Sequence, residues 1–516
     1  MNEDEAGSVP NGGPSYKTKS TWLDLSVIAA VFAVYAILPT KNYYWDGVCY
    51  SQKIEQAAAP GSAFFWQNLI HPNHLFYNWA GYVAWTALQR LGGHVRVLSV
   101  LQAVDIICAA LCTGILRRTL QWITKSAYMS TTLSLLFAFS AVFWKYATDS
   151  DSYIPSVLFL VAALYILCTS SKARPFLVAT LHICAMLIHQ LAIFFFPAAA
   201  LALHLKGGRR SFWQYCLPTT VVTVIAYWGG FWLEMRTTSP AAFLRWITNH
   251  SPDVSFSFNP VRDFVITLTN YPRLFFGGTG RFLQYLSPFM LFTLLLLAAA
   301  LFAFIVTVLR NRKGLRLLFH VPPLTFPLRI ALVWLASYAL FLFFWLPWNA
   351  FYKLFCLPAI IVIMAEFLMQ YRGPRHYRLA LFVAAMALAN LSIYIYPYSR
   401  TDYNQSLRFA HRMSHIWPDQ TVVYYREFTT DNCFVAYFNP STTWKRVDPA
   451  GGSATFSEST GRDLAAGHQV WLDSTAAEAL AKDWPGVTSQ FDAMQADATP
   501  KHPIQFYRWS STGSHK

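Results

Sequence analysis

The sequence predicts a polytopic α-helical membrane protein, and three observations support this fold class. Of the 516 residues, 55% are hydrophobic and only 13% are charged. The apolar residues fall in blocks of roughly 17 to 25, which is long enough for a helix to cross a hydrocarbon core of about 30 Å. Lys and Arg recur in every second segment between these blocks, as expected when alternate loops face the cytoplasm.

Residues 1–20 are polar and rich in Gly, Pro and Ser, so they lack the apolar core and cleavage site of a removable secretory signal. We predict that they form a disordered cytoplasmic segment and that the first apolar block remains as the first span. The later blocks predict about eleven crossings in a membrane domain of residues 21–398. The expected spans are 23–39, 95–116, 128–147, 153–170, a pair of short helices within 175–205, 214–233, 285–309, 328–346, 349–370 and 379–397.

The formal net charge is +15, but the basic residues are spread over alternate loops and do not form the single basic face of a nucleic-acid-binding protein. We therefore expect no nucleic-acid partner. The positive-inside rule makes these loops cytoplasmic, so the N-terminus lies inside and the C-terminal tail outside. The residues that mark these loops are Lys17 and Lys19, then Arg117, Arg118 and Lys125, then Lys172 and Arg174, then Lys206, Arg209 and Arg210, then Arg310, Arg312, Lys313 and Arg316, and finally Arg372, Arg375 and Arg378.

Residues 71–91 are long enough to cross the membrane, yet a crossing here would place Arg117, Arg118 and all later basic loops outside. The charge pattern therefore favours a helix that lies along the outer interface, a level of the bilayer that suits its Trp, Tyr, His and Asn side chains. The first outer loop then covers residues 40–94, and a second long outer segment covers 234–284.

The composition changes after residue 398. Short apolar or alternating runs (TVVYY, HQVWLDS and IQFYRW) are interleaved with helix-like stretches such as TAAEALAKD, which predicts a soluble extracytoplasmic α/β domain over residues 399–516. Most of the eight cysteines fall within predicted spans and are expected to be small core residues. Cys49 and Cys433 lie outside the spans, which leaves open either a disulfide between the first outer loop and the tail or two free thiols.

Polar motifs gather in the predicted outer regions. The first outer loop contains YYWDGVCYS with Asp46 and, further on, HPNHLFYN with His71 and His74. Two acids, Asp149 and Asp151, lie in TDSDSY directly before a predicted span. A late segment, WLPWNAFYKLFC, places a lysine just inside the outer end of a span. No CxxC, HExxH or glycine-rich phosphate loop occurs, which excludes the usual soluble zinc and nucleotide-binding classes.

In their order, these motifs resemble the GT-C superfamily of glycosyltransferases, membrane enzymes that take a sugar from a polyprenyl-phosphate carrier outside the cytoplasm. The resemblance covers most of residues 23–397 and includes the Gly and Arg pattern from LGGHVRVLS to LRRTL. Within the superfamily, the sequence resembles the protein mannosyltransferase and lipid A aminoarabinose transferase group. Two features depart from the pattern: Asn73 and His74 replace the usual prolyl-leucyl pair, and the first loop has one Asp where many relatives have an Asp-Glu pair.

The resemblance implies a GT-C-like fold, a polyprenyl-phosphate-linked sugar donor, an extracytoplasmic glycan, lipid or protein acceptor, and a bacterial inner membrane location. Sugar transfer itself requires a base near the acceptor and cations on the leaving phosphate. The site must lie at the membrane surface, because the lipid tail of the donor stays in the bilayer. Asp46 is the candidate base, since it follows the first span by only a few residues. The alternative interpretation is an Asp-Gly turn where the chain leaves the membrane.

The acids Asp149 and Asp151 are candidates to orient the acceptor, or to hold Mg²⁺ or Mn²⁺ together with Asp46. The alternative is a solvated cap for the next helix, because SDSY is a good helix N-terminal signal. Lys353 is the candidate partner of the donor phosphate, since a cation within the membrane is costly unless it pairs or snorkels to the interface. Snorkelling alone is the alternative. Asp105, in the middle of the second span, is either a functional acid or a structural partner of a neighbouring helix.

The other candidates for binding phosphate or lipid carry weaker signals. The histidines of HPNHLFYN either contact phosphate or acceptor, or are interfacial residues without a catalytic part. Two arginines flank LFFGGTG, whose glycines would let backbone amides approach an anion, although a plain loop also explains them. A histidine next to Gln190 is expected where the paired short helices turn, and a tyrosine precedes the late lysine. These candidates are His71, His74, His189, Arg273, Arg281 and Tyr352.

Two other classes of function stay open from the sequence. A secondary transporter would also have about a dozen spans, but its site is expected at the bilayer midplane on broken helices. Here the polar residues concentrate in outer loops instead. A membrane-anchored receptor or scaffold would work through the soluble tail, and it would need neither an acid in the first loop nor a lysine in the span 349–370. In all three readings the lipid bilayer is a partner.

Overall fold

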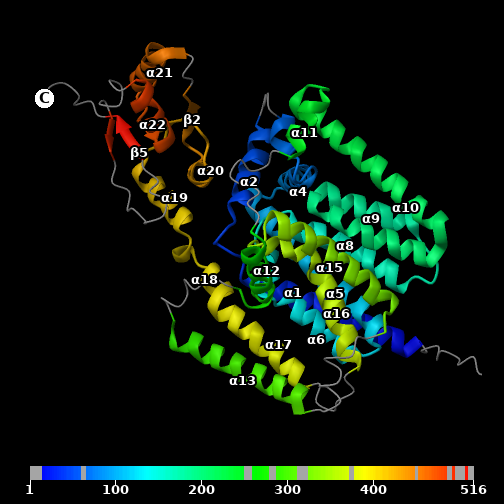
Figure 1. Cartoon of the computed structure of the whole chain (residues 1–516). Coiled ribbons are helices and arrows are strands. Elements are labelled where there is room, and N and C mark those ends of the chain that lie inside the picture. The colour runs from blue at the N-terminus through cyan, green and yellow to red at the C-terminus, as the bar shows by residue number, and fades with distance from the viewer. Residues whose placement is uncertain are drawn as a thin grey trace, which may run out of the picture. The chain divides into compact units, whose positions relative to one another are not determined.

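Figure 1 shows the computed structural model of the whole chain. The residues that the structure describes are 14–59, 65–248, 259–277, 286–310, 323–370, 377–447, 451–484, 491–493 and 506–509. The chain forms two compact units. The first unit comprises residues 1–40 and 57–399, and the second comprises residues 41–56 and 400–516.

The first unit is a polytopic helical membrane domain. Within the described residues, six helices are long and apolar enough to cross a membrane, and the bent pair α6 and α7 makes a seventh if it is counted as one span. The elements in chain order are α1 (Pro14–Ile37), α3 (Phe65–Leu69), α4 (Tyr77–Arg90), α5 (Val97–Thr124), α6 (Ala127–Ala138), α7 (Ala141–Ala147), α8 (Tyr153–Thr169), α9 (Pro175–Ile188), η1 (Gln190–Phe195), α10 (Phe196–Met235), α11 (Pro240–Thr248), α12 (Pro260–Phe276), α13 (Pro288–Arg310), α15 (Phe326–Trp345), η3 (Phe351–Cys356), α16 (Leu357–Gln370), α17 (Tyr377–Asn390), η4 (Leu391–Ile395) and α18 (Tyr396–Tyr398).

Some spans that hydropathy predicts as single helices are broken or bent. The block at 128–147 forms α6 and α7, which are bent by 68°. Helix α10 covers 40 residues only because two arms join at Gly208, whose φ of 65° lies in the left-handed region that glycine adopts readily. Three further apolar helices, at the start of the chain and at α8 and α9, are shorter. The total of about eleven crossings stays a prediction.

Helices α1 and α5 run antiparallel, and polar contacts join both ends of the pair. At one end, Asp24 forms a buried ion pair with Arg117. At the other end, the side-chain amide of Gln102 donates a hydrogen bond of 3.0 Å to the carbonyl of Thr40. The chain between α1 and α5 therefore leaves and returns at the same end of the helix pair. Residues 71–91 are consequently not a crossing, as the charge pattern predicts.

Within that segment, α4 is too short to span a bilayer. Its 14 residues correspond to a length of about 21 Å, against about 30 Å for a hydrocarbon core. Apolar side chains in this segment are exposed: Trp79 in α4 is 44% exposed, and Leu91, directly after the helix, is 84% exposed. Such a helix suits the interface between lipid and water, where an amphipathic aromatic side chain is stable.

The basic loops and the acids lie at opposite ends of the helices. Helix α8 begins directly after the two acids of TDSDSY and ends at Thr169. Just beyond that end, Lys206 donates a hydrogen bond of 2.6 Å to the carbonyl of Ser170 and lies 4.9 Å from the centre of the Phe326 ring. Phe326 begins α15, which ends near the late lysine segment. This arrangement is what the positive-inside rule requires, and the assignment of the basic end to the cytoplasm stays a prediction.

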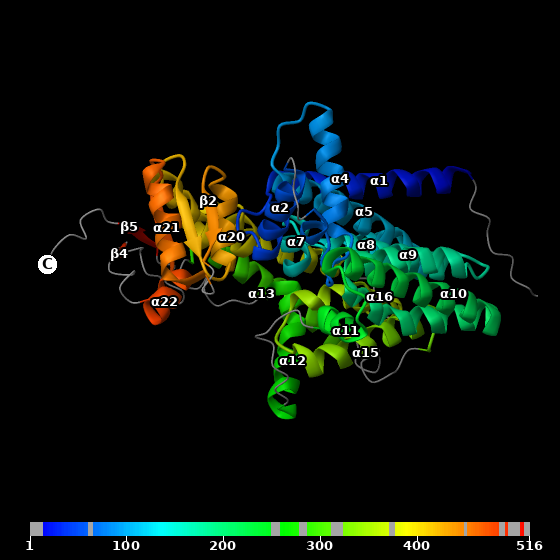
Figure 2. The ribbon, with the colours of Figure 1, turned by 90° about the horizontal axis from the view of Figure 1, so that it is seen from above.

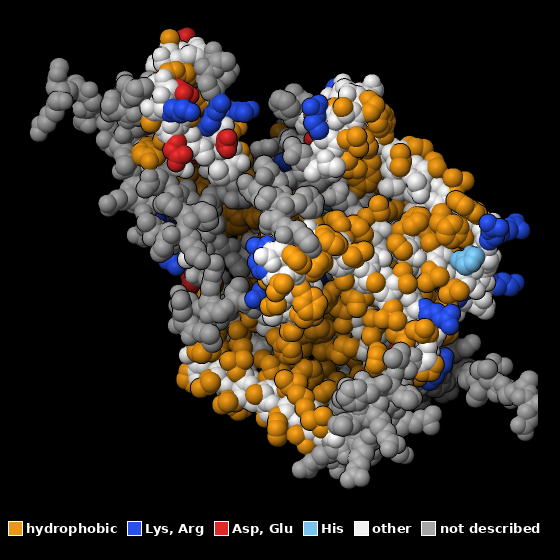
Figure 3. Space-filling model, in the orientation of Figure 1, with side chains coloured by type: hydrophobic (Ala, Val, Ile, Leu, Met, Phe, Trp, Pro, Cys, Tyr) orange, Lys and Arg blue, Asp and Glu red, His pale blue; other side chains and the backbone are white. Residues whose placement is uncertain are grey.

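The surface of this unit is apolar where lipid is expected. Figure 3 shows a face on which hydrophobic side chains cover most of the helices, while Lys and Arg lie mainly at the margins. Many large apolar side chains are more than half exposed, which is unusual for a protein surrounded by water. They include Trp213, Leu217, Ile225, Phe292, Phe302 and Leu340.

The second unit contains a five-stranded sheet with helices on both faces, which confirms the predicted α/β fold of the tail (Figure 2). The strand order is β2-β1-β3-β5-β4, in which β1 is parallel to β2 and β3 and the last two pairings are antiparallel. Phe456 and Leu480 pack on one face, and Met413 and Val435 pack on the other. The elements are η5 (Thr401–Tyr403), α19 (Gln405–Ile416), β1 (Val422–Tyr425), α20 (Thr430–Phe438), β2 (Thr443–Arg446), α21 (Gly452–Ala465), β3 (Val470–Asp473), α22 (Ser474–Asp483), β4 (Phe491–Ala493) and β5 (Phe506–Trp509).

Helix α2 (Trp45–Ala58) belongs to the second unit over most of its length, although it lies in the first outer loop of the sequence. A disulfide joins Cys49 in α2 to Cys433 in α20. This bond settles the alternative that the cysteine positions leave open. The first outer loop is therefore divided, with residues 41–56 in one unit and the later residues in the other.

A topology experiment checks the sidedness of the membrane domain. We expect a reporter fused after residue 398 to read extracytoplasmic, because basic residues mark every second loop and this alternation places that end outside. A reporter fused within 310–320, most of which lies outside the described residues, is expected to read cytoplasmic. Single cysteines introduced at His71 and Leu91 are both expected to react with an impermeant thiol reagent added outside. An inverted reporter pattern would place Asp46 in the cytoplasm and contradict sugar transfer on the outer side.

Candidate functional site

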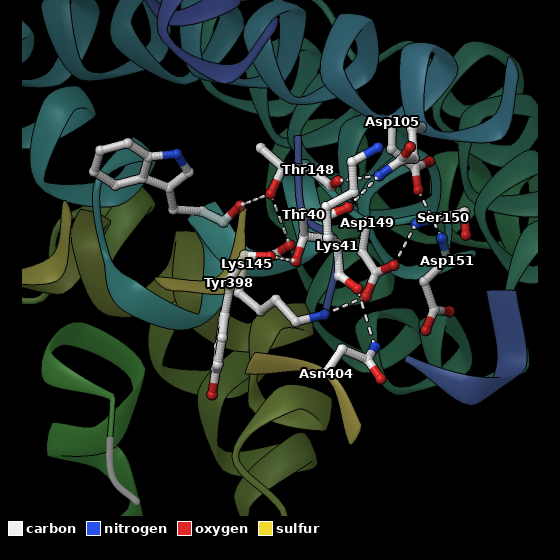
Figure 4. Close-up of polar contacts among 12 residues, drawn as sticks. Thr40, Lys41, Asp105, Lys145, Thr148, Asp149, Ser150, Asp151, Tyr398 and Asn404 are labelled. Atoms are coloured by element: carbon white, nitrogen blue, oxygen red, sulfur yellow. Dashed lines mark hydrogen bonds and ion pairs between the residues drawn. The ribbon is translucent and has the colours of Figure 1, made fainter. Parts of the chain in front are cut away.

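Residues 148–152, which we call the acidic turn, connect α7 to α8 and carry two of the candidate acids (Figure 4). Asp149 and Asp151 are both buried. Asp149 forms an ion pair with Lys145, one helical turn earlier, and accepts a hydrogen bond of 2.9 Å from its neighbour's N–H. Asp151 accepts a bond of 2.7 Å from the N–H of Ser152, the N-cap residue of α8. The acids are therefore not a solvated helix cap.

A third buried acid, Asp105 in α5, joins the acidic turn. Its Oδ2 accepts a hydrogen bond of 2.7 Å from the N–H of Asp151. Tyr77, at the start of α4, lies close to the same group of acids. Burial raises the pKa of Tyr77 well above its ordinary value, and the negative charges of Asp105, Asp151 and Asp149 raise it further. Asp105 thus contacts the acidic turn, and a functional role for this acid stays a prediction.

The HPNH element of the first outer loop lies beside the end of α9. The ring centroids of His71 and His74 are 4.2 Å apart, and the His74 ring lies 6.4 Å from that of Tyr77. The N–H of Gln190 donates a bond of 2.8 Å to the carbonyl of Asn73, and its side-chain amide donates one of 2.5 Å to Asn73 Oδ1. The asparagine that departs from the family pattern therefore joins the first outer loop to the turn after α9.

An aromatic cluster connects the acidic turn to the late lysine segment. The ring of Tyr153, directly after the acidic turn, lies 5.1 Å from that of His189 and 5.9 Å from that of Tyr352. Phe351 stacks on Tyr153 with a centroid distance of 5.5 Å. His189 Nδ1 accepts a hydrogen bond of 3.1 Å from the N–H of Leu191, so the neutral ring carries its hydrogen on Nε2. Two predicted lipid-binding residues, His189 and Tyr352, therefore meet near the acids.

Lys353 lies in η3 and is fully buried. Its ammonium group donates a hydrogen bond of 3.0 Å to the carbonyl of Pro347 and lies 5.1 Å from the centre of the Tyr271 ring. The same carbonyl accepts a bond of 3.0 Å from the amide of Asn270, whose Oδ1 accepts one of 2.9 Å from Arg273. One carbonyl and one asparagine thus link the two cations that the sequence nominates separately for the donor phosphate.

Within the described residues, the charge of this pair of cations has no carboxylate counterion. Within the described ranges, neither Lys353 nor Arg273 forms an ion pair with a carboxylate. A buried ammonium group is costly when it lacks an anion, and a snorkelling lysine reaches water instead. Because Lys353 is 0% exposed, snorkelling alone does not explain it. The arrangement is suited to an anion that enters beside η3.

Asp46 lies in the first turn of α2, where the helix dipole favours a carboxylate. The alternative of an Asp-Gly turn is wrong as a description of the local structure, because Asp46 and Gly47 are both helical. Asp46 is half-buried and belongs to the second unit, whereas the other candidate acids belong to the first. Arg281 lies outside the described residues.

The predicted metal ligands are Asp46, Asp149 and Asp151, and Asp149 already has other polar partners. Asp149 directs one carboxylate oxygen at Lys145 and the other at the N–H of Ser150. No group of three or more His, Cys, Asp or Glu residues in the described part of the chain is arranged to hold a metal ion. Asp46 belongs to the other unit, so the three-acid set of Asp46, Asp149 and Asp151 is not tested. A divalent cation stays a prediction, and no step below depends on one.

Sequence reasoning missed three polar residues of the site. Lys145 stands four residues before Asp149, and this spacing is the ordinary signal of an ion pair along a helix. Asn270 stands three residues before Arg273, and this spacing also makes two side chains neighbours on a helix surface. Gln102 is a buried polar residue in an apolar span, which marks a functional or structural contact in membrane proteins. Periodicity on a helix would have indicated the first two.

Gln102→Leu is expected to loosen the acidic turn. The side-chain amide of Gln102 donates hydrogen bonds of 3.0 Å to the carbonyl of Thr40 and 2.9 Å to that of Thr148. Leucine has no donor, so the free energy of unfolding should fall by about 1–3 kcal/mol. Turnover should fall several-fold, with donor binding unchanged. Thermal unfolding and turnover of the purified variant measure both effects.

Gln121→Leu is the matched control for that experiment. It removes an amide from the other end of the same helix, where the side chain accepts a hydrogen bond of 3.0 Å from Ser130. Turnover should stay at the wild-type level in this variant. Equal turnover in both variants and the wild type would show that Gln102 does not support the acidic turn.

A fold with acids, aromatic residues and cations gathered at one end of the membrane helices can be compared with solved structures. Among solved structures, the chain is similar to ArnT from Cupriavidus metallidurans bound to undecaprenyl phosphate, with 11% identity, a TM-score of 0.56, and coverage of 97% of this chain and 99% of that one. The apo structure of that protein gives 13% identity, a TM-score of 0.57, and coverage of 97% and 100%.

A third structure, the Archaeoglobus fulgidus oligosaccharyltransferase in its apo form, has 12% identity and a TM-score of 0.44 over 93% of this chain and 76% of that one. No known family matches the sequence, and no curated protein matches it. The agreement with the ArnT structures over nearly the full length of both chains confirms the fold that the sequence motifs indicate.

Proposed function

We propose that this protein is a membrane glycosyltransferase that transfers a sugar from a polyprenyl-phosphate carrier to an extracytoplasmic glycan, lipid or protein. The observation that carries the proposal is the buried Lys353, which is linked to Arg273 and has no carboxylate partner within the described residues. An anion with a lipid tail fits such a place, because its tail stays among apolar helices while its phosphate meets the cations.

The fold supports the same proposal. ArnT, a lipid A aminoarabinose transferase, was solved with undecaprenyl phosphate bound, and this chain is similar to it over 97% of its length. By this analogy, the donor here is a polyprenyl-phosphate sugar, and the protein acts in a bacterial inner membrane with its C-terminal domain outside. Fold similarity does not identify the sugar or the acceptor.

The proposed chemistry assigns separate tasks to the two kinds of charge. The acceptor hydroxyl or amine attacks the anomeric carbon of the sugar and gives its proton to Asp46, while the bond from that carbon to the phosphate oxygen breaks. Negative charge grows on the departing polyprenyl phosphate, and Lys353 and Arg273 stabilise it. Asp149 and Asp151 orient the acceptor. The rings of Tyr153 and its aromatic neighbours offer a surface on which a sugar can stack.

A secondary transporter is less consistent with these contacts. Transporter sites lie near the bilayer midplane on broken helices. The described candidates gather instead at the end of the helices opposite Lys206, around the acidic turn and η3. A receptor or scaffold that works through the soluble tail gives no reason for a buried lysine that has no carboxylate partner within the described residues.

The experiment that tests the proposal uses purified protein in lipid nanodiscs with a set of polyprenyl-phosphate sugars. We expect release of free polyprenyl phosphate that depends on the sugar donor and increases when a cell-envelope extract supplies the acceptor. Addition of a chelator tests the divalent cation separately. The proposal would be contradicted if the protein did not bind polyprenyl phosphate. It would also be contradicted if the protein moved sugar across a liposome membrane without releasing polyprenyl phosphate.

A further inference from the structure

The C-terminal domain holds a helix that comes from the first outer loop. The disulfide between Cys49 and Cys433 joins α2 to α20. At the end of α2, the hydroxyl of Tyr437 donates a hydrogen bond of 3.4 Å to Glu55 Oε1. Before α2 begins, other contacts attach the same segment to the domain. The ring of Tyr43 stacks on Phe438 at 6.1 Å, and the amide of Asn404 donates a bond of 3.0 Å to the carbonyl of Lys41.

These contacts, which we call the α2 clamp, extend along the whole of residues 41–56. Three of the four reach α20, at Cys433, Tyr437 and Phe438. A helix of 14 residues is marginal by itself in water, so its position depends on such tertiary contacts. The contacts all lie within the second unit. The domain therefore fixes the orientation of α2 within the second unit.

The disulfide lies close in the sequence to Asp46, the candidate base of the proposed function. Asp46 precedes Cys49 by three residues, which is about 4.5 Å along a helix axis and on neighbouring faces. A covalent bond at Cys49 therefore limits the movement of the Asp46 carboxylate.

We infer that the α2 clamp positions Asp46 within the C-terminal domain, so that this domain holds the proposed base. This inference rests on the proposed function, and it assigns a task to a domain that sugar transfer by the membrane helices does not otherwise require. Cys49 and Cys433 are positioning residues, since they act through α2 and do not touch the substrate. Loss of the clamp should lower turnover and leave the affinity for the lipid donor unchanged, because the proposed phosphate partners belong to the other unit.

The test opens the disulfide in the folded protein with a dithiol reductant. In the exchange, two electrons and two protons pass to Cys49 and Cys433, and the reductant closes its own disulfide. We expect turnover to fall about tenfold, which is about 1.4 kcal/mol in the barrier, with KM for the donor unchanged. Hydrogen exchange of the amides in 45–58 should become faster.

A double variant, Cys49→Ser with Cys433→Ser, is the matched control. It should show the same low turnover without reductant and no further change when reductant is added, which separates this disulfide from the six free cysteines. Tyr437→Phe, with the disulfide intact, should give a smaller change in the same direction. If the serine variants do not fold, reduction of the folded wild-type protein still gives the answer.

Two outcomes would overturn the inference. One is unchanged hydrogen exchange in 45–58 after reduction, which would mean that the disulfide does not restrain α2. The other is faster exchange with unchanged turnover, which would mean that the restraint has no catalytic effect. These outcomes can be distinguished from failure of the proposed function itself. In that case no donor-dependent release of polyprenyl phosphate would occur, even in the oxidised protein.

Discussion

Asp46→Asn is expected to lower the rate of sugar transfer at least ~10²-fold, while the protein stays folded and binds its lipid donor normally. Asparagine keeps the size and most of the hydrogen bonds of aspartate but cannot accept the proton of the acceptor. The measurement compares turnover and donor affinity of the purified variant with those of the wild type. Because only the chemical step needs the base, the rate constant should fall and the affinity should not.

Asp402→Asn is the matched control for Asp46→Asn. This acid lies in η5 of the same unit, so the variant removes an equal charge from the same domain. Its turnover should equal that of the wild type. Near wild-type turnover in Asp46→Asn would remove Asp46 as the base and leave Asp149 and Asp151 as the candidate acids.

Lys353→Ala is expected to weaken binding of the lipid donor by about 10- to 100-fold, which corresponds to the loss of a hydrogen bond to a charged group. Turnover at saturating donor should also fall, because the charge on the leaving phosphate grows in the transition state. Binding of polyprenyl phosphate and turnover of the sugar donor measure the two effects separately. Arg273→Ala should give a smaller loss, since this side chain is exposed whereas Lys353 is buried.

Two variants make the result at Lys353 specific. Lys353→Met keeps most of the apolar stem and removes the charge, so it should bind donor as weakly as the alanine variant while packing better. Lys172→Ala removes an exposed lysine from the loop before α9 and should leave donor binding unchanged. Equal donor affinity in the wild type and both Lys353 variants would show that the buried lysine has a structural part only.

Much of the membrane domain could be predicted from the sequence, because a lipid-exposed helix must be apolar over its own length. Charge alternation also indicated that residues 71–91 do not cross, and the Thr40 and Gln102 contact agrees with this. The bend between α6 and α7 could not be predicted, since hydropathy averages over the block and carries no information on direction. The adjacent glycines 207 and 208 are a local signal for the break at Gly208, but the same pair is equally compatible with a loop.

The candidate site was predicted residue by residue and not as an arrangement. The sequence nominates Lys353, Arg273, His189 and Tyr352 through separate weak signals, and it contains no measure of the distances between them. Their proximity results from packing of η3 against α8, α12 and the turn after α9. The part played by Asn270 appears only in that packing.

By itself, the sequence determined that the chain is a polytopic membrane protein, which segments are apolar enough to cross, and that the tail is an α/β domain. These properties depend on local composition and periodicity, which each segment carries within itself. Only the tertiary structure decided that α2 belongs with the C-terminal domain, that Cys49 pairs with Cys433, and that the acidic turn is buried against Asp105. Contacts between residues far apart in the chain arise from packing of whole elements, and packing is a property of the folded chain that no single segment contains.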